Sequence, residues 1–173
     1  MAFSEERERT YLSIVKKYES KEVMLFPKLL ALTTEALEAE YQDFLGQQFM
    51  SLDMGSKWHG QFFTPYPICR MMAEMTFDLS LFDEKEVVTV NEPTCGGGAM
   101  INAICEYLKE KKINFQHRLR VVCQDISAVA AHMCYIQLSL LGCPAQVLIG
   151  NTLKVECHTK YVTPMAIMRG WIN

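Results

Sequence analysis

The 173-residue sequence lacks a surplus of positive charge, because 17 lysines and arginines stand against 20 aspartates and glutamates, for a net charge of −3. This balance excludes a protein that coats nucleic acid by charge alone, so DNA contact is expected to be local or to come through a partner subunit. Residues 1–17 are rich in charged side chains rather than apolar, so we expect no signal peptide. We therefore expect a cytoplasmic protein.

Paired cysteine motifs are absent as well. The seven cysteines include no Cys-x-x-Cys pair, and their odd number and apolar surroundings indicate reduced, buried thiols. A zinc site built from the available candidates would have irregular ligand spacing, so we expect no metal. The candidates considered are Cys123, Cys134, Cys143, Cys157, His132 and His158.

The longest charge-free stretch, residues 126–153, does not have the pattern of a membrane span. Gly142 and Pro144 divide it into a helix of ordinary length and a short strand, and several polar side chains interrupt it. We expect this stretch to be buried core and expect no membrane contact.

Helical patterns dominate the first 58 residues, which we treat as an N-terminal helical segment. One helix is expected from the N-cap Ser4 to about Glu19, and a second from about Pro27 to Leu52. The second is amphipathic, with Asp43 expected on its polar side. Its apolar side is expected to pack on the same chain, with a partner helix as the alternative.

A strand, a glycine-rich turn and a helix start follow one another in residues 87–100, Val-Val-Thr-Val-Asn-Glu-Pro-Thr-Cys-Gly-Gly-Gly-Ala-Met. Glycines at such a junction allow positive φ and close approach of a ligand to the helix amides. The stretch fits neither the Gly-x-Gly-x-x-Gly dinucleotide pattern nor a phosphate-binding loop. With Glu92 at the strand end, it favours a ligand carrying both a cationic group and a carboxylate, and we favour S-adenosylmethionine.

Alternating strands and helices continue beyond this loop. We expect a helix at 98–111, a strand at 119–125, a helix ending at Gly142 and a strand at 146–150. The apolar residues of the first helix are Ala99, Ile101, Ala103, Ile104 and Leu108, and the second helix presents Val129, Met133, Ile136 and Leu140 on one face. This order predicts an α/β domain over residues 59–173, with a mainly parallel sheet and helices on both faces. Asp125 is placed to bind ribose hydroxyls, or alternatively to cap the next helix, and Glu92, Asp125 and Asn151 should gather at the strand ends.

Two aromatic residues, Phe62 and Phe63, precede a helix for which Thr64 is the expected N-cap and Pro65 the first residue. The simplest interpretation is that both rings are core residues. The alternative is that the helix N-terminus and the rings hold a carboxylate and an adenine.

Four ordered motifs resemble the N6-adenine DNA methyltransferases, especially the modification subunits of type I restriction-modification systems. They are Gly-Gln-Phe-Phe-Thr-Pro (60–65), Glu-Pro-Thr-Cys-Gly-Gly-Gly (92–98), Gln-Asp-Ile-Ser (124–127) and Gly-Asn-Thr-Leu (150–153). The resemblance implies a three-layer Rossmann-like domain that binds S-adenosylmethionine, with Asn151 in place of the family's usual aspartate. The cofactor-binding residues it implies are Phe63, Thr64, Pro65, Glu92, Pro93, Thr94, Cys95, Gly96, Gly98, Asp125, Ile126 and Asn151.

Family members also carry an Asn/Asp/Ser-Pro-Pro-aromatic motif that binds the flipped adenine, and this sequence has no Pro-Pro pair. The nearest candidate is Thr163-Pro164-Met165, so the catalytic residues stay unassigned. The chain also stops at Asn173, before several strands that the family would add. We expect an incomplete sheet whose edge is covered by self-association, by a partner chain or by a longer natural chain.

Three functions remain open on these grounds. The first is methyl transfer to the adenine amino group of DNA by direct displacement and without a metal, in a restriction-modification or mobile-element setting. The second is a catalytically inactive subunit that binds S-adenosylmethionine and regulates or assists a partner. The third is a methyltransferase with a substrate other than DNA.

Overall fold

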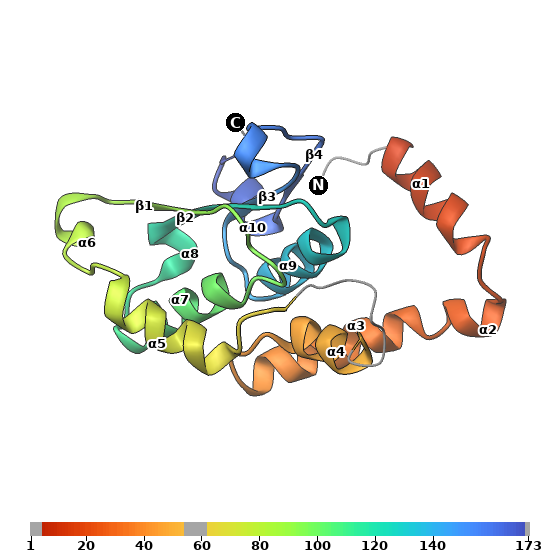
Figure 1. Ribbon diagram of the computed structural model, residues 1–173, viewed down its shortest axis with the longest axis horizontal. Coiled ribbons are helices and arrows are strands. Elements are labelled where there is room, and N and C mark those ends of the chain that lie inside the picture. Colours follow the sequence, from red (N-terminus) through yellow and green to blue (C-terminus); the bar gives the residue numbers. More distant parts are fainter. Residues whose placement is uncertain (1–4, 54–61, 172–173) are drawn as a thin grey trace.

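The computed structural model describes residues 5–53 and 62–171, which are arranged around a four-stranded sheet (Figure 1). The strands are β1 (Val88–Glu92), β2 (Leu119–Asp125), β3 (Ala145–Ile149) and β4 (Thr159–Val162), in the order β1-β2-β3-β4. The first three are parallel to one another, and β4 runs antiparallel to β3. The expected α/β class with a mainly parallel sheet is confirmed.

The helices lie mostly on one side of this sheet in Figure 1. They are α1 (Glu5–Val15), α2 (Ser20–Val23), α3 (Phe26–Ala39), α4 (Phe44–Asp53), α5 (Tyr66–Thr76), α6 (Leu81–Glu84), α7 (Ala99–Glu110), α8 (Phe115–Arg118), α9 (Ala128–Leu140), α10 (Pro164–Met168) and the 3₁₀ turn η1 (Thr152–Lys154). None of the helices described is long and apolar enough to cross a membrane.

Two consecutive βαβ units place α7 and α9 on the same face of the sheet, because both right-handed crossovers step in the same direction. Val121 and Val147 point toward these helices and are fully buried. On the other face, Thr89 is exposed, and Gln146 donates a hydrogen bond to the carbonyl of Trp171, just beyond α10 (3.1 Å). The sequence predicts helices on both faces of the sheet. Within the described residues, the layer on this second face consists of the short α10 region alone.

The apolar side expected for α7 is confirmed, since Ile101, Ala103 and Leu108 are all fully buried. Each large side chain of this kind contributes roughly 1.5–3 kcal/mol when buried. The prediction of which side of α9 is buried is wrong. Its buried positions include Ala131, Cys134 and Leu138, whereas the residues expected inside are exposed or half-buried; these are Val129, Met133, Ile136 and Leu140. Because α9 is apolar on all sides, periodicity did not distinguish its inner side, and small residues face the sheet.

The N-terminal region is helical as expected, but its boundaries differ. The first helix ends at Val15 rather than near residue 19, and its expected cap Ser4 lies outside the described residues. The second helix is two helices, α3 and α4, separated by residues 40–43. The break follows from Asp43, whose carboxylate accepts a hydrogen bond from the Gly46 amide (3.0 Å) and so caps α4.

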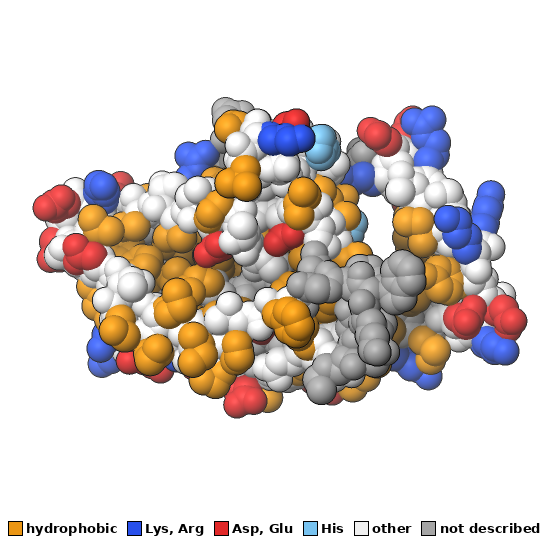
Figure 2. Space-filling view, in the orientation of Figure 1, with side chains coloured by type: hydrophobic (Ala, Val, Ile, Leu, Met, Phe, Trp, Pro, Cys, Tyr) orange, Lys and Arg blue, Asp and Glu red, His pale blue; other side chains and the backbone are white. Residues whose placement is uncertain are grey.

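Helix α5 packs against α7 and begins at Tyr66, so the expectation that Thr64 is its N-cap is wrong. Pro65 takes the cap position, without a side-chain hydrogen bond. Arg70 holds the two helices together, because its guanidinium pairs with Glu106 (3.1 Å) and with Glu110. Figure 2 shows hydrophobic side chains exposed along α5; they include Ile68, Met71, Met72 and Met75.

Candidate functional site

The glycine loop connects β1 to α7 at the carboxyl end of the sheet. Gly96 and Gly98 have φ values of +52° and +99°, conformations that residues with a side chain rarely adopt. The Gly98 amide donates to the Cys95 carbonyl (2.8 Å), and the Cys95 amide donates to the Gln124 carbonyl (2.9 Å). The expected strand, turn and helix start are therefore confirmed, and the loop is tied to the end of β2.

Asp125 lies directly beside this loop. Its Oδ2 accepts a hydrogen bond from the Gly96 amide (2.9 Å) and its Oδ1 accepts one from the Ser127 amide (2.8 Å). Ser127, rather than Asp125, is the N-cap of α9, since its hydroxyl accepts from the Ala130 amide (3.4 Å). The carboxylate of Asp125 thus fastens the glycine loop to β2.

A hollow of about 230 Å³ opens between the glycine loop and the start of α5. Among its lining residues are six of those expected from the sequence: Phe63, Thr64, Glu92, Thr94, Cys95 and Gly96. A neighbouring hollow of about 250 Å³ is lined by Pro65 and shares Asp43, Phe63 and Thr64 with the first. The two segments that flank these hollows are about thirty residues apart in the chain, as the motif positions 62–65 and 92–100 show.

The other expected residues do not line these hollows. Pro93 accepts a hydrogen bond from the Thr152 hydroxyl through its carbonyl (2.7 Å), and Asn151 Oδ1 accepts from the Lys154 amide (3.2 Å). Ile126 is largely exposed, and Gly98 packs against α9 at Cys134. Through its hydrogen bond Pro93 ties together the segments that follow β1 and β3, and the Asn151 bond lies within the second of these segments.

Phe63 forms one wall of the hollow and is half-buried. Its ring stacks on Phe49 of α4, with centroids 5.5 Å apart and planes 30° apart. Phe63 also lies over the loop, because a Cβ added at Gly96 would be 3.2 Å from its Cδ1. Phe62 is 86% exposed, so the simple expectation that both rings are core residues is wrong.

Sequence reasoning missed Asp43, which lines both hollows and is only 3% exposed. Its Oδ1 accepts hydrogen bonds from the Gly46 amide (3.0 Å) and from Gln137 Nε2 (2.7 Å). Burial raises the pKa of Asp43, and the two hydrogen bonds oppose that rise. Asp43 directly precedes α4, and an aspartate at such a position is a common helix N-cap. The sequence analysis missed this signal because it predicted one continuous helix across residue 43.

Gln137 extends this network from α9 to the glycine loop. Its Nε2 donates to the Gly97 carbonyl (2.7 Å) as well as to Asp43, and its Oε1 accepts from the Leu45 amide (3.2 Å). A Cβ added at Gly97 would lie 2.8 Å from Asp43 Oδ1. The glycine loop is consequently held by α4 and α9 together.

Thr163, in the segment nearest to the missing Pro-Pro motif, is fully buried and has three partners. Its hydroxyl donates to the Cys143 carbonyl (2.7 Å) and accepts from the amides of Ala145 (2.9 Å) and Ala166 (3.4 Å). These contacts cap α10 and lie at the amino end of β3, away from the glycine loop. Thr163 therefore has a structural role.

The fold is an α/β domain with a hollow at the carboxyl ends of its parallel strands, the position at which domains of this architecture commonly bind ligands. The family described as N-6 DNA Methylase matches residues 40–168. Since this match covers well over half of the sequence, the chain belongs to that family, and the resemblance drawn from the sequence is confirmed.

Similar solved structures include a modification subunit of a candidate type I restriction enzyme from Vibrio vulnificus YJ016, with 20% identity and a TM-score of 0.43 over 56% of this chain and 20% of that one. Another is a candidate class I S-adenosylmethionine-dependent methyltransferase from Listeria monocytogenes, with 16% identity and a TM-score of 0.46 over 66% of this chain and 36% of that one. This chain thus spans only a part of each. No curated protein sequence matches it.

Proposed function

We propose that the hollow beside the glycine loop binds S-adenosylmethionine and that the chain supplies the cofactor-binding part of a DNA adenine N6-methyltransferase of restriction-modification or mobile-element type. The observation that carries this proposal is the convergence of Phe63, Thr64, Glu92 and the glycine loop on one hollow. Membership of the N-6 DNA Methylase family supports the choice of reaction.

The residues present fit the chemical groups of this cofactor. Free amides at the start of α7 suit a carboxylate, the carboxylates of Glu92 and Asp43 suit an ammonium group, and the Phe63 ring offers an apolar surface for adenine. Asp125 does not line the hollow itself, but it accepts a hydrogen bond from Gly96, which does. Its carboxylate retains unused lone pairs, and we assign it the ribose hydroxyls. When bound, the cofactor supplies an electrophilic methyl group, and the residues of this chain position it.

The groups that would bind the target adenine are not evident in the described residues. Thr163 cannot serve, because its hydroxyl is buried and fully used. β4 occupies the β3 edge of the sheet, whereas β1 has a strand neighbour on one side only within residues 5–53 and 62–171. We propose that adenine recognition and DNA contact come from a second copy, a partner subunit or further chain adjoining β1.

A second candidate follows from the same observation. A chain that keeps the cofactor hollow but has no Pro-Pro motif, and whose nearest substitute is structural, suits a regulatory or partner subunit without its own activity. We also propose that the region before residue 59 is a helical segment attached to the cofactor domain, and that the protein works in the cytoplasm.

Calorimetric titration of the chain with S-adenosylmethionine tests the cofactor proposal. Gly96→Val should weaken binding at least tenfold, because Val strains a positive φ and meets Phe63. Gly170→Val is the matched control, since Gly170 has a φ of +71° but nothing within 4 Å of an added Cβ. Binding of wild type and Gly170→Val, with loss in Gly96→Val, supports the site. Absence of heat with wild type would refute it.

Transfer of a radioactive methyl group to unmethylated DNA separates the two candidates. Incorporation by the isolated chain supports the methyltransferase. Cofactor binding without incorporation supports the non-catalytic subunit, and incorporation on addition of a partner chain would place the missing groups in that partner.

A further inference from the structure

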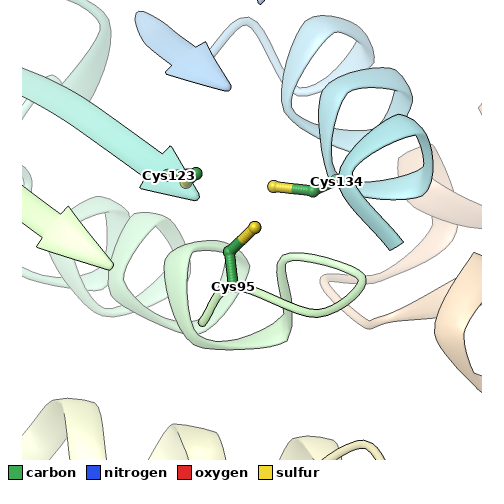
Figure 3. A group of neighbouring side chains, drawn as sticks. All are labelled: Cys95, Cys123 and Cys134. Carbon is green, nitrogen blue, oxygen red and sulfur yellow. The ribbon is translucent and has the colours of Figure 1, made fainter. Parts of the chain in front are cut away.

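Three cysteines that are distant in the sequence come together behind the glycine loop. Cys95 lies in the loop, Cys123 near the end of β2 and Cys134 in α9, and their Sγ atoms all lie within 4.8 Å of one another. Figure 3 shows the three side chains beside one another, with those of Cys95 and Cys134 pointing into the space between them. All three are free thiols.

The cluster is enclosed. Cys123 and Cys134 are 0% exposed, and Cys95 is 6% exposed where it lines the hollow. The neighbouring Cys123 and Cys134 thiols lower the pKa of the Cys95 thiol. The expectation of no metal considered Cys123 and Cys134 but not Cys95.

The spacing suits a metal ion. A thiolate sulfur lies about 2.3 Å from zinc, so two sulfurs on one trigonal ion are about 4 Å apart. The cluster would reach that spacing if its sulfurs moved inward by less than about 1 Å. Thiolates select soft ions, and the candidate ligand group in the described residues contains three donors rather than the four of a structural zinc site.

We propose that Cys95, Cys123 and Cys134 form a three-thiolate site for one soft metal ion. Binding would replace the thiol protons, so the affinity should rise with pH. The ion would join the glycine loop to β2 and α9, and would thereby fix the backbone of the hollow that Cys95 lines. This proposal concerns the thiols themselves and does not depend on the cofactor.

Titration of the reduced full chain with Cd²⁺ tests the site, because bonds between cadmium and thiolate absorb in the ultraviolet. One equivalent of Cd²⁺ should saturate the absorbance. Cys134→Ala should weaken binding on the order of 100-fold, since it removes a direct ligand. Cys143→Ala is the matched control, because Cys143 is also a fully buried thiol but lies outside the cluster. Cys157→Ala controls for the exposed thiol.

X-ray absorption of cadmium bound to the wild-type chain gives a result that does not require the variants to fold. Three sulfur neighbours at one distance are expected. Two or fewer sulfurs, or binding that Cys134→Ala leaves unchanged while Cys157→Ala removes it, would overturn the proposal. Because both measurements are made without S-adenosylmethionine, failure of the cofactor proposal would leave them unaffected.

Discussion

Asp43 offers a test of how the glycine loop is supported, because two substitutions separate its hydrogen bonds from its charge. Both hydrogen bonds that Asp43 receives, from Gly46 and from Gln137, end on the same oxygen, Oδ1. Asp43→Asn can keep that oxygen while removing the charge. Asp43→Ala removes the acceptor altogether.

The two substitutions should reduce the stability of the fold by different amounts. Loss of the helix cap in Asp43→Ala costs about 0.5–2 kcal/mol, and a buried Gln137 N–H without an acceptor costs about 1–3 kcal/mol more. We therefore expect Asp43→Ala to lower the free energy of unfolding by about 1.5–5 kcal/mol at pH 7. Asp43→Asn should lie within about 1 kcal/mol of wild type. Urea unfolding followed by circular dichroism measures both differences.

The pH dependence supplies a second readout. Burial raises the folded-state pKa of Asp43 above its unfolded value, so the protonated carboxyl favours folding. The stability that this contributes is fully present below the unfolded pKa, about 3.9, and is lost as the pH rises through the folded pKa. The stability of Asp43→Asn relative to wild type should accordingly increase across that window. Two results would refute this account. One is an equal loss of stability in Asp43→Asn and Asp43→Ala, and the other is a stability difference between Asp43→Asn and wild type that does not change with pH.

Three further substitutions test neighbouring parts of the structure. Asp125→Ala should weaken S-adenosylmethionine binding at least tenfold, because the Gly96 amide loses its acceptor; unchanged affinity by calorimetry would contradict the assigned role. Thr163→Val should lower the free energy of unfolding by about 1–3 kcal/mol without changing cofactor affinity, and an altered affinity would argue against a purely structural Thr163. Arg70→Met should lower the unfolding midpoint in urea by separating α5 from α7, and an unchanged midpoint would show that this ion pair is dispensable.

The central strands and α7 could be predicted from sequence because their local and global signals agree. The β-branched run ending at Glu92 gave β1, and the spacing of Ile101, Ile104 and Leu108 identified the buried side of α7. The glycine triplet marked the turn between them, and two of its residues indeed have positive φ.

The remaining features depend on tertiary packing that periodicity cannot reveal. In α9, small residues such as Ala131 and Cys134 face the sheet because the helix lies close to it, and larger apolar residues are left outside. Asp43 looked like one more acid on a polar helix side. Its burial depends on Gln137, which is 94 residues away in the chain, and no local pattern encodes that contact.

The shape of the candidate site is itself a product of long-range contacts. Gly96 is held by Asp125 of β2, Gly97 by Gln137 of α9, and Cys95 by the end of β2 through Gln124. A loop fixed at three successive residues by two other elements, β2 and α9, cannot keep its conformation when those elements unfold. Since a ligand that binds only the folded loop stabilises the whole fold, the S-adenosylmethionine that we propose for this site should protect β2 and α9 against unfolding as well as the loop.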